Sequence, residues 1–282
     1  MTTAMIKKRA EVPDHLIQWV DGFPVPPDLP FRPLHAAVST GKLILNKEDT
    51  RQVYEVIEAL AGGAGKRLFR RFVSTPYGRR VVTEPVKLEE ILSDRQRLRA
   101  MPEGSFGRAY LAFMEGENLT TDGLLGAAEE AGIDYKGETQ FPQFRRMFLH
   151  INVSHDLWHV LTGYGRDALG ELCVLAFTRE QTKNPGIAFI NRIGILAQKL
   201  TSPGVPVLAA FEEGKRMGEG VDFLLGEDVE ALLPLPLAEV RRKLGVIEPS
   251  VYNAIPAAVK ASILKPAVKN TQAEREGRAV AA

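Results

Sequence analysis

The chain has 282 residues, of which 45% are hydrophobic and 25% charged, so it is long and apolar enough to bury a full core. Its net charge of +1, with no basic stripe carrying stacking aromatic residues, argues against a dedicated nucleic-acid-binding protein. A single cysteine excludes an internal disulfide, and the sequence shows neither a secretory signal peptide nor an apolar stretch long enough for a transmembrane helix.

Residues 1–33 contain six prolines and predict an extended arm, with at most one short helix around Leu16 to Val20. The remaining pattern is helical, apart from a short extended piece predicted at residues 80–83. Helices are predicted at residues 34–43, 47–61, 65–75, 88–92, 107–115, 124–131, 143–162, 169–182, 186–200, 207–217, 228–232 and 237–244. We therefore expect a mostly α-helical protein with a single domain over residues 34–267, followed by a disordered tail at residues 268–282.

The helix predicted at residues 143–162 carries three side chains that can bind a metal ion. His155, Asp156 and His159 fall within an arc of about 100° on an α-helix, because each residue advances about 100° around the axis. Glu171 follows after eleven intervening residues, and it would lie about 24 Å from His155 if the helix continued unbroken. Glu171 can join the site only if the chain reverses.

The segment between the two helices has the residues that such a reversal needs. Gly163 or Gly165 can end the first helix in a left-handed conformation, and Asp167 is a good N-cap for the next. This pattern predicts an αα-hairpin with facing ligands. Glu171 is also the lone charge in a helical segment, residues 169–177, that is otherwise apolar on every side, so its burial requires a partner such as a shared cation.

A non-metal interpretation is that Glu171 complements the helix dipole while the histidines are ordinary core or surface residues. The combination of four ligand-type residues favours a metal site instead. Two imidazoles and two carboxylates suit Zn²⁺, Fe²⁺ or Mn²⁺ rather than Ca²⁺. Ligation by all four would make a closed, structural site, whereas three ligands would leave a position open for water or a substrate carboxylate.

The HDxxH motif, eleven residues and a glutamate resemble the signature of the coenzyme Q (ubiquinone) biosynthesis protein four family. Three other segments fit the same family: LRAMPEGSFGRAYLAFMEGENLT, GRRVVTEP and PLAEVRRKLGV. The resemblance covers roughly residues 33–245. It implies a helical protein that holds a divalent metal, expected to be zinc, through His155, Asp156, His159 and Glu171.

The resemblance also implies a prenylated quinone precursor or another isoprenoid lipid as ligand, other quinone-biosynthesis proteins as partners, and a location peripheral to the membrane where the quinone is made. Because the single cysteine and the lack of a signal peptide favour the cytoplasm, we expect the inner face of that membrane. The sequence allows a homodimer but does not determine the oligomeric state. We expect the metal to hold the ring of the ligand and an apolar channel to hold its tail. Candidate substrate contacts are Asn152, Tyr164, Leu172, Val174, Leu175, Phe189 and Ile193. The family pattern places arginines three and five residues before the first metal histidine, where this chain has Asn152 and His150.

Two classes of function follow from the resemblance. One is an enzyme, a metal-dependent lyase acting in oxidative decarboxylation of a prenylated hydroxybenzoate-type ring. The other is a non-catalytic, lipid-binding scaffold that organises the quinone-biosynthetic complex. The residues alone also allow a third class, a metal-dependent phosphohydrolase. It would need His35 and Asp222 as further ligands beside the adjacent His155-Asp156 pair.

Overall fold

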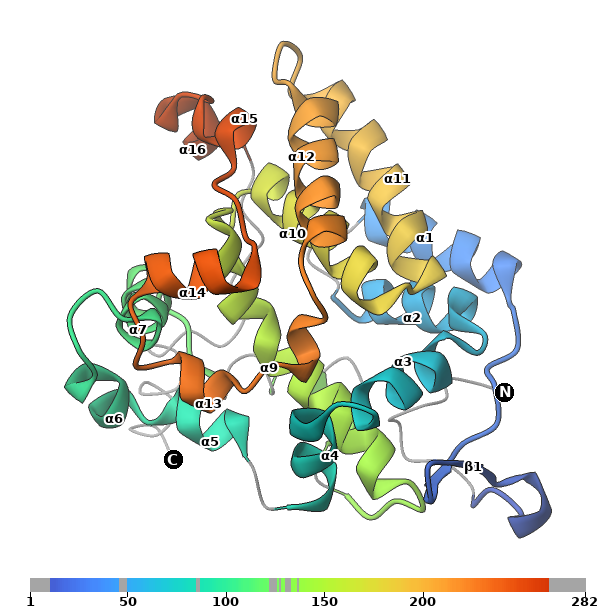
Figure 1. Ribbon diagram of the computed structural model, residues 1–282. Helices are drawn as coiled ribbons and strands as arrows, with labels where there is room; N and C mark the ends of the chain where they lie inside the picture. Colours follow the sequence, from blue (N-terminus) through green and yellow to red (C-terminus); the bar gives the residue numbers. More distant parts are fainter. Residues whose placement is uncertain are drawn as a thin grey trace, which may run out of the picture.

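The computed structural model describes residues 11–45, 50–84, 87–121, 126, 128–129, 133–135 and 137–263. As predicted, the described chain is mostly α-helical and forms one domain (Figure 1). The α-helices are α1 (Pro33–Leu45), α2 (Thr50–Ala61), α3 (Ala64–Val73), α4 (Pro76–Thr83), α5 (Leu88–Ser93), α6 (Arg95–Ala100), α7 (Phe106–Gly116), α9 (Pro142–Thr162), α10 (Ala168–Thr182), α11 (Pro185–Thr201), α12 (Val207–Gly220), α13 (Val229–Leu232), α14 (Leu237–Leu244), α15 (Ser250–Asn253) and α16 (Ala257–Ser262). Two 3₁₀ turns, Asp14–Leu16 and Leu224–Gly226, complete the helical elements.

The N-terminal arm contains a β-hairpin where a short helix was predicted. Strands β1 (Gln18–Val20) and β2 (Phe23–Val25) pair antiparallel around Asp21-Gly22. Both turn residues have positive φ, 49° and 84°, which is the geometry that an Asp-Gly hairpin turn favours. The helix prediction was wrong because this two-residue turn signal outweighs local helix propensity. Val20 and Val25 are buried in the main core, so the hairpin packs onto the helical domain.

Four helices were not predicted, and each has a local signal at its start. Thr75 caps α4 through Gly78 N–H with Pro76 in the first turn, so the extended piece predicted at 80–83 was wrong. Asp94 caps α6 in the same way through Arg97 N–H. The short helices α15 and α16 each follow a proline, Pro249 and Pro256. The helix predicted at 124–131 falls largely, and the tail at 268–282 wholly, outside the described residues.

Helix α9 runs through the middle of the molecule (Figure 1) and contacts α3, α4, α5 and α7. Phe144, Met147, Val153 and Leu157 on this helix are buried in the main core. Arg241 of α14 secures the end of α9 by donating from Nε to the Leu161 carbonyl at 2.8 Å and from Nη2 to the Val160 carbonyl at 2.9 Å. These bonds satisfy carbonyls that the last turn of a helix leaves without partners.

A second layer of helices packs beside α9. Helix α10 lies against α11 and α12, and α11 in turn packs on α2, which pairs with α1. No helix in the described parts of the chain combines the length and the apolarity needed to span a bilayer. The two layers meet at the connection between α9 and α10, where the predicted metal ligands lie.

Candidate metal centre

The connection between α9 and α10 reverses the chain as the sequence predicted. Gly163 ends α9 with φ 80°, and its N–H donates to the His159 carbonyl. Asp167 caps α10 by accepting from Leu169 N–H at 3.2 Å and Gly170 N–H at 3.1 Å. A β-carbon at Gly170 would overlap the carbonyl of Gly165, so only glycine permits this tight return.

The reversal brings three of the four predicted ligands together. Nε2 of His155 and Nε2 of His159 are 3.3 Å apart, and each lies 3.4 Å from Oε2 of Glu171. A tetrahedral zinc ion with Zn–N distances of about 2.0–2.1 Å has donor-to-donor edges of roughly 3.3–3.4 Å. The three donor atoms therefore have the spacing of one face of such a coordination tetrahedron, which fits a divalent ion.

His159 is oriented for coordination by its other ring nitrogen. Its Nδ1 donates to the Tyr164 carbonyl at 3.0 Å, which leaves the Nε2 lone pair of the neutral ring facing the cluster. The side chain of His159 is fully buried, and its ring stacks on Phe113 with centroids 5.6 Å apart. Backbone and aromatic contacts thus fix both the tautomer and the plane of this ligand.

The charges in the cluster depend on one another. Burial opposes ionisation of Glu171, but the adjacent His159 and His155 outweigh it and hold the pKa of Glu171 well below its usual value. Burial likewise opposes a charge on His159, yet Glu171 and Asp156 raise the pKa of this imidazole. Positive charge on the two histidines thus stabilises the ionised form of Glu171, and a bound cation would stabilise it in the same way.

Asp156 does not join the three-donor group among the described residues. It is buried, and burial raises the pKa of its carboxyl despite the nearby His155, His159 and Arg166. Direct ligation by Asp156 therefore stays a prediction. Its place beside the cluster also suits a carboxylate that orients the ligands rather than one that binds the ion.

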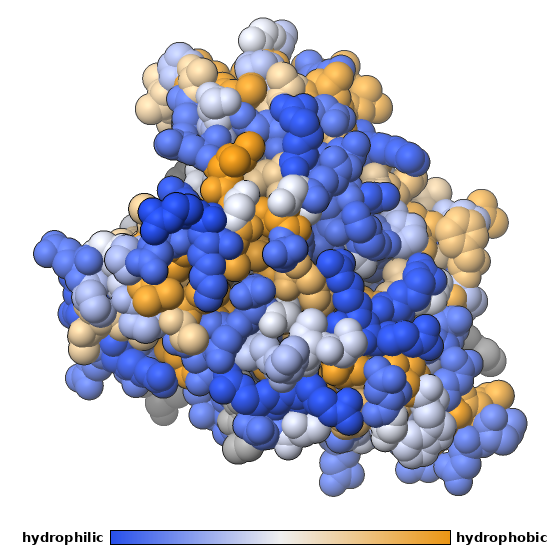
Figure 2. All heavy atoms as spheres, in the orientation of Figure 1, coloured by the Kyte–Doolittle hydropathy of each residue, from blue (hydrophilic) through white to orange (hydrophobic). Residues whose placement is uncertain are grey.

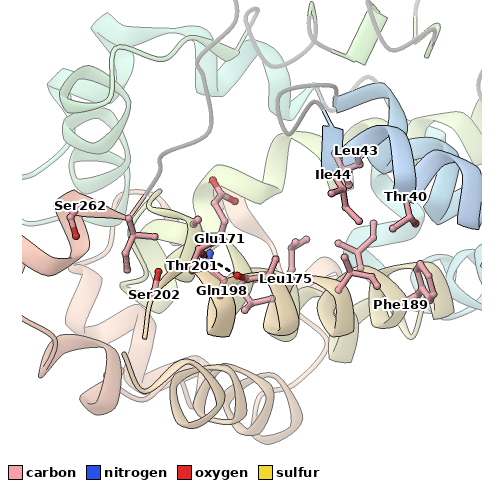
Figure 3. A pocket seen from close by; sticks show the side chains of 17 residues that line it. Thr40, Leu43, Ile44, Glu171, Leu175, Phe189, Gln198, Thr201, Ser202 and Ser262 are labelled. Carbon is pink, nitrogen blue, oxygen red and sulfur yellow. Dashed lines mark hydrogen bonds between the residues drawn. The ribbon is translucent and has the colours of Figure 1, made fainter. Parts of the chain in front are cut away.

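An apolar cavity of about 390 Å³ opens beside the cluster, and Glu171 lines it. Figure 3 shows Glu171, Gln198, Thr201 and Ser202 toward one end, and Thr40 and Phe189 toward the other. The predicted contacts Leu172, Leu175, Phe189 and Ile193 line this cavity, whereas Val174 is buried in the main core. The cavity is thus polar at the end near the cluster and apolar along its length.

The remaining predicted contacts lie away from the cavity lining. The Tyr164 ring is buried against Tyr252 with centroids 5.3 Å apart, so Tyr164 contributes its carbonyl to the site rather than its hydroxyl. Asn152 lies one turn before His155 and accepts from the Tyr54 hydroxyl at 3.4 Å. Contacts of either side chain with a substrate stay predictions.

Sequence reasoning missed the wall that α1 contributes to the cavity and the polar residue that α11 places in it. Thr40, Leu43 and Ile44 line the cavity at helical spacing, a pattern that could have identified them. Gln198 is buried, and its Oε1 has no hydrogen-bond partner among the residues that the structure describes. Such an unpaired acceptor in an apolar cavity is suited to a ligand that donates a hydrogen bond.

The residues needed for a phosphohydrolase are not assembled. His35 of α1 pairs with Glu55 of α2 at 2.9 Å, and neither His35 nor Asp222 belongs to the ligand group found among the described residues. The geometry therefore gives no support to the phosphohydrolase alternative.

Residues 31–250 match the family model for the coenzyme Q (ubiquinone) biosynthesis protein Coq4. The chain is 28% identical over 206 residues to the mitochondrial ubiquinone biosynthesis protein COQ4 homolog of Bos taurus, covering 70% of this chain and 72% of the bovine protein. It is 25% identical to the Xenopus tropicalis homolog, covering 64% of this chain and 60% of that protein.

A putative ubiquinone biosynthesis protein from Nostoc punctiforme has a similar fold, with a TM-score of 0.55 at 18% identity over 76% of this chain and 95% of that one. The family model spans both the HDxxH helix and Glu171, so the fold, the motif and the sequence relatives agree. The chain therefore belongs to the coenzyme Q (ubiquinone) biosynthesis protein Coq4 family and is a ubiquinone biosynthesis protein.

Proposed function

We propose that this protein binds a prenylated hydroxybenzoate-type ring and, with a divalent metal expected to be zinc, acts in oxidative decarboxylation of that ring. The observation that carries the proposal is the double role of Glu171, which belongs to the three-donor group and also lines the apolar cavity. A ligand whose tail fills the cavity would bring its head group to the metal ligands. Fe²⁺ or Mn²⁺ would suit the same donors.

His155, His159 and Glu171 would hold the ion, and the ion would supply Lewis-acid polarisation of the substrate carboxylate. The chain's own residues bind and orient the substrate. Leu172, Leu175 and Phe189 would exclude water from the tail, and the free Oε1 of Gln198 would accept a hydrogen bond from a ring hydroxyl. In the proposed reaction the bond between the ring and its carboxyl group breaks with release of CO₂, and the ring carbon gains a hydroxyl group whose oxygen comes from water. Dioxygen, as a second substrate, takes up the two electrons and two protons and becomes hydrogen peroxide.

A scaffold that binds prenylated lipid without chemistry is the second candidate. Asp156 favours it, because its carboxylate would be a fourth donor beside the other three and could close the coordination shell, leaving no position for a substrate. The metal would then stabilise the turn between α9 and α10 and so shape the cavity that holds the lipid.

The two candidates differ in whether carbon dioxide is released. Purified metal-loaded protein would be incubated with a geranyl-substituted hydroxybenzoate, labelled with ¹³C in its carboxyl group, in the presence of dioxygen. Release of labelled CO₂ by the loaded protein, but not by the chelated protein, is expected for the enzyme. Saturable binding without release under zinc, iron and manganese would support the scaffold instead.

Exposed apolar side chains near the cavity support a location at a membrane surface. Ile44, which lines the cavity, is 59% exposed, and Leu196 and Leu200 on α11 are 59% and 75% exposed. Figure 2 shows a largely hydrophilic face with apolar atoms over α1, over the ends of α11 and α12, and in the middle of the face between α12 and α14. A prenylated ligand leaving a bilayer could pass from such a surface into the cavity.

Filling the cavity should weaken binding of long-tailed ligands selectively. Leu175 is partly buried on α10 and lines the cavity, so Leu175→Trp should reduce the affinity for a ligand with a tail of several isoprene units by about tenfold or more, because the indole occupies the space of the tail. Calorimetric titration with long-tailed and single-isoprene ring compounds measures this. Leu196→Trp, on the exposed face of α11, is the matched control. Equal loss for both tail lengths would contradict a tail-binding cavity.

A further inference from the structure

We propose that Arg166 is the anion-recognising residue of this site, binding a carboxylate or phosphate group of the ligand next to the metal ligands. The inference rests on the proposed function and extends it, because it identifies the charge that the head group must carry. Arg166 lies in the connection between α9 and α10, just before the Asp167 cap.

Glu171 links Arg166 to the three-donor group. Its Oε2 faces the two imidazoles at 3.4 Å, while its Oε1 lies 3.6 Å from Nε of Arg166. The guanidinium is therefore separated from the two histidines by the Glu171 carboxylate. Arg166 is not among the residues that line the cavity, so a head group would meet the guanidinium only where the cavity ends at Glu171.

The contact with Glu171 leaves most hydrogen-bond donors of the Arg166 guanidinium unused. The Arg166 side chain is only 13% exposed, and at 3.6 Å its contact with Glu171 is longer than a hydrogen bond. Among the described residues, Glu171 is the carboxylate that contacts this guanidinium, and Asp156 interacts with it electrostatically. A guanidinium carries five N–H donors in a planar fork that matches two oxygens of a carboxylate or phosphate, so most of its hydrogen-bonding capacity is left for a ligand.

The charges of the occupied site favour an anion. A divalent ion and Arg166 supply three positive charges, and metal-bound imidazoles are neutral. Glu171 and Asp156 supply at most two negative charges, because burial favours the neutral form of Asp156. The site then carries a net positive charge in a partly buried place, where electrostatic interactions are stronger than in water. A neutral phenol ring would leave that charge without a partner.

The segment carrying Arg166 is held in place on both sides. Gly165 N–H donates to the Tyr252 hydroxyl at 3.0 Å, and the same hydroxyl donates to the Asp167 carboxylate. Tyr252 belongs to α15, whose N-terminal N–H groups are in turn bound by Glu213 of α12. The arginine is thus presented by a rigid turn, which reduces the entropy cost of binding a ligand.

Three geranyl compounds test the inference in the zinc-loaded protein by calorimetric titration: 3-geranyl-4-hydroxybenzoate, 2-geranylphenol and geranyl monophosphate. We expect the native protein to bind at least one anionic compound about tenfold or more tightly than the phenol, a gap typical of a charge-assisted pair. Arg166→Gln should bring that ratio close to one without changing the zinc content or the affinity for 2-geranylphenol. Arg166→Lys should keep part of the preference, and Arg242→Gln, at an exposed position, should keep all of it.

The outcomes separate this inference from the function on which it rests. If the native protein binds none of the three compounds, the proposed function fails. If it binds the phenol as well as the anions, or if Arg166→Gln keeps the preference, only the assignment of Arg166 is overturned. Loss of zinc from both Arg166 variants would show that Arg166 positions Glu171 as a metal ligand. That result would also overturn the assignment of Arg166 as the anion-binding residue. The stronger of the two anions identifies carboxylate or phosphate as the group recognised.

Discussion

Replacing Glu171 with alanine should lower the zinc affinity by at least about 100-fold, because loss of even an outer partner of a metal ligand costs 10–100-fold and Glu171 supplies one of three converging donors. Metal content after dialysis against a competing chelator, measured by elemental analysis, gives the result. In cells that depend on this protein, the same variant should accumulate a prenylated ring that retains its carboxyl group.

Two companion variants sharpen this experiment. Glu219→Ala removes an exposed glutamate from α12 and should leave the metal content unchanged. Asp156→Asn distinguishes the role of the remaining carboxylate, since a loss equal to that of Glu171→Ala would make Asp156 a direct ligand. Native protein isolated without chelators and found free of metal would contradict the metal site as a whole.

Replacing His150 with leucine should remove a large part of the acid sensitivity of the fold. His150 is 2% exposed and lies against the rings of Phe72 and Tyr77, with centroid distances of 5.5 and 5.6 Å. Neither of its ring nitrogens has a hydrogen-bond partner within the described part of the chain. Burial, with a smaller contribution from Arg146, lowers the pKa of His150 from 6.5 to about 3. The imidazole is therefore neutral in the folded chain at any pH near neutrality.

The direction of the effect follows from proton binding in the two states. Between pH 6.5 and pH 3 the unfolded chain binds a proton at this position and the folded chain does not, so the free energy of unfolding falls as the pH falls. At pH 5 the loss from this residue is about 2 kcal/mol relative to pH 8. His150→Leu should remove that loss while changing stability at pH 8 by about 1 kcal/mol or less, since the native ring makes no hydrogen bonds.

Urea unfolding of the native chain and the variant at pH 8 and pH 5 measures the difference. His15→Leu is the control, because His15 is exposed and replacing it should not change the pH dependence. An unchanged pH dependence in His150→Leu would show that the ring is protonated or solvated in the folded chain.

The sequence by itself determined the helical class, the reversal between α9 and α10, and three of the donors. Each of these depends on signals within a few residues: the spacing of His155 and His159 on one helix face, the left-handed glycine at 163, and the Asp167 cap. The isolation of Glu171 among apolar residues is equally local. The residues next to each of these features encode it, so each can be predicted from the sequence without knowing the contacts between distant segments.

Only the tertiary structure decided which distant segments complete the site. The α1 wall of the cavity and the support of the turn by Tyr252 depend on helices brought together by core packing. The tertiary structure also leaves Asp156 outside the three-donor group, although its position on the same face of the helix as the two histidines allowed it to join. Burial and side-chain direction at these positions are set by many weak contacts between residues far apart in the chain, and such contacts leave no local pattern to read.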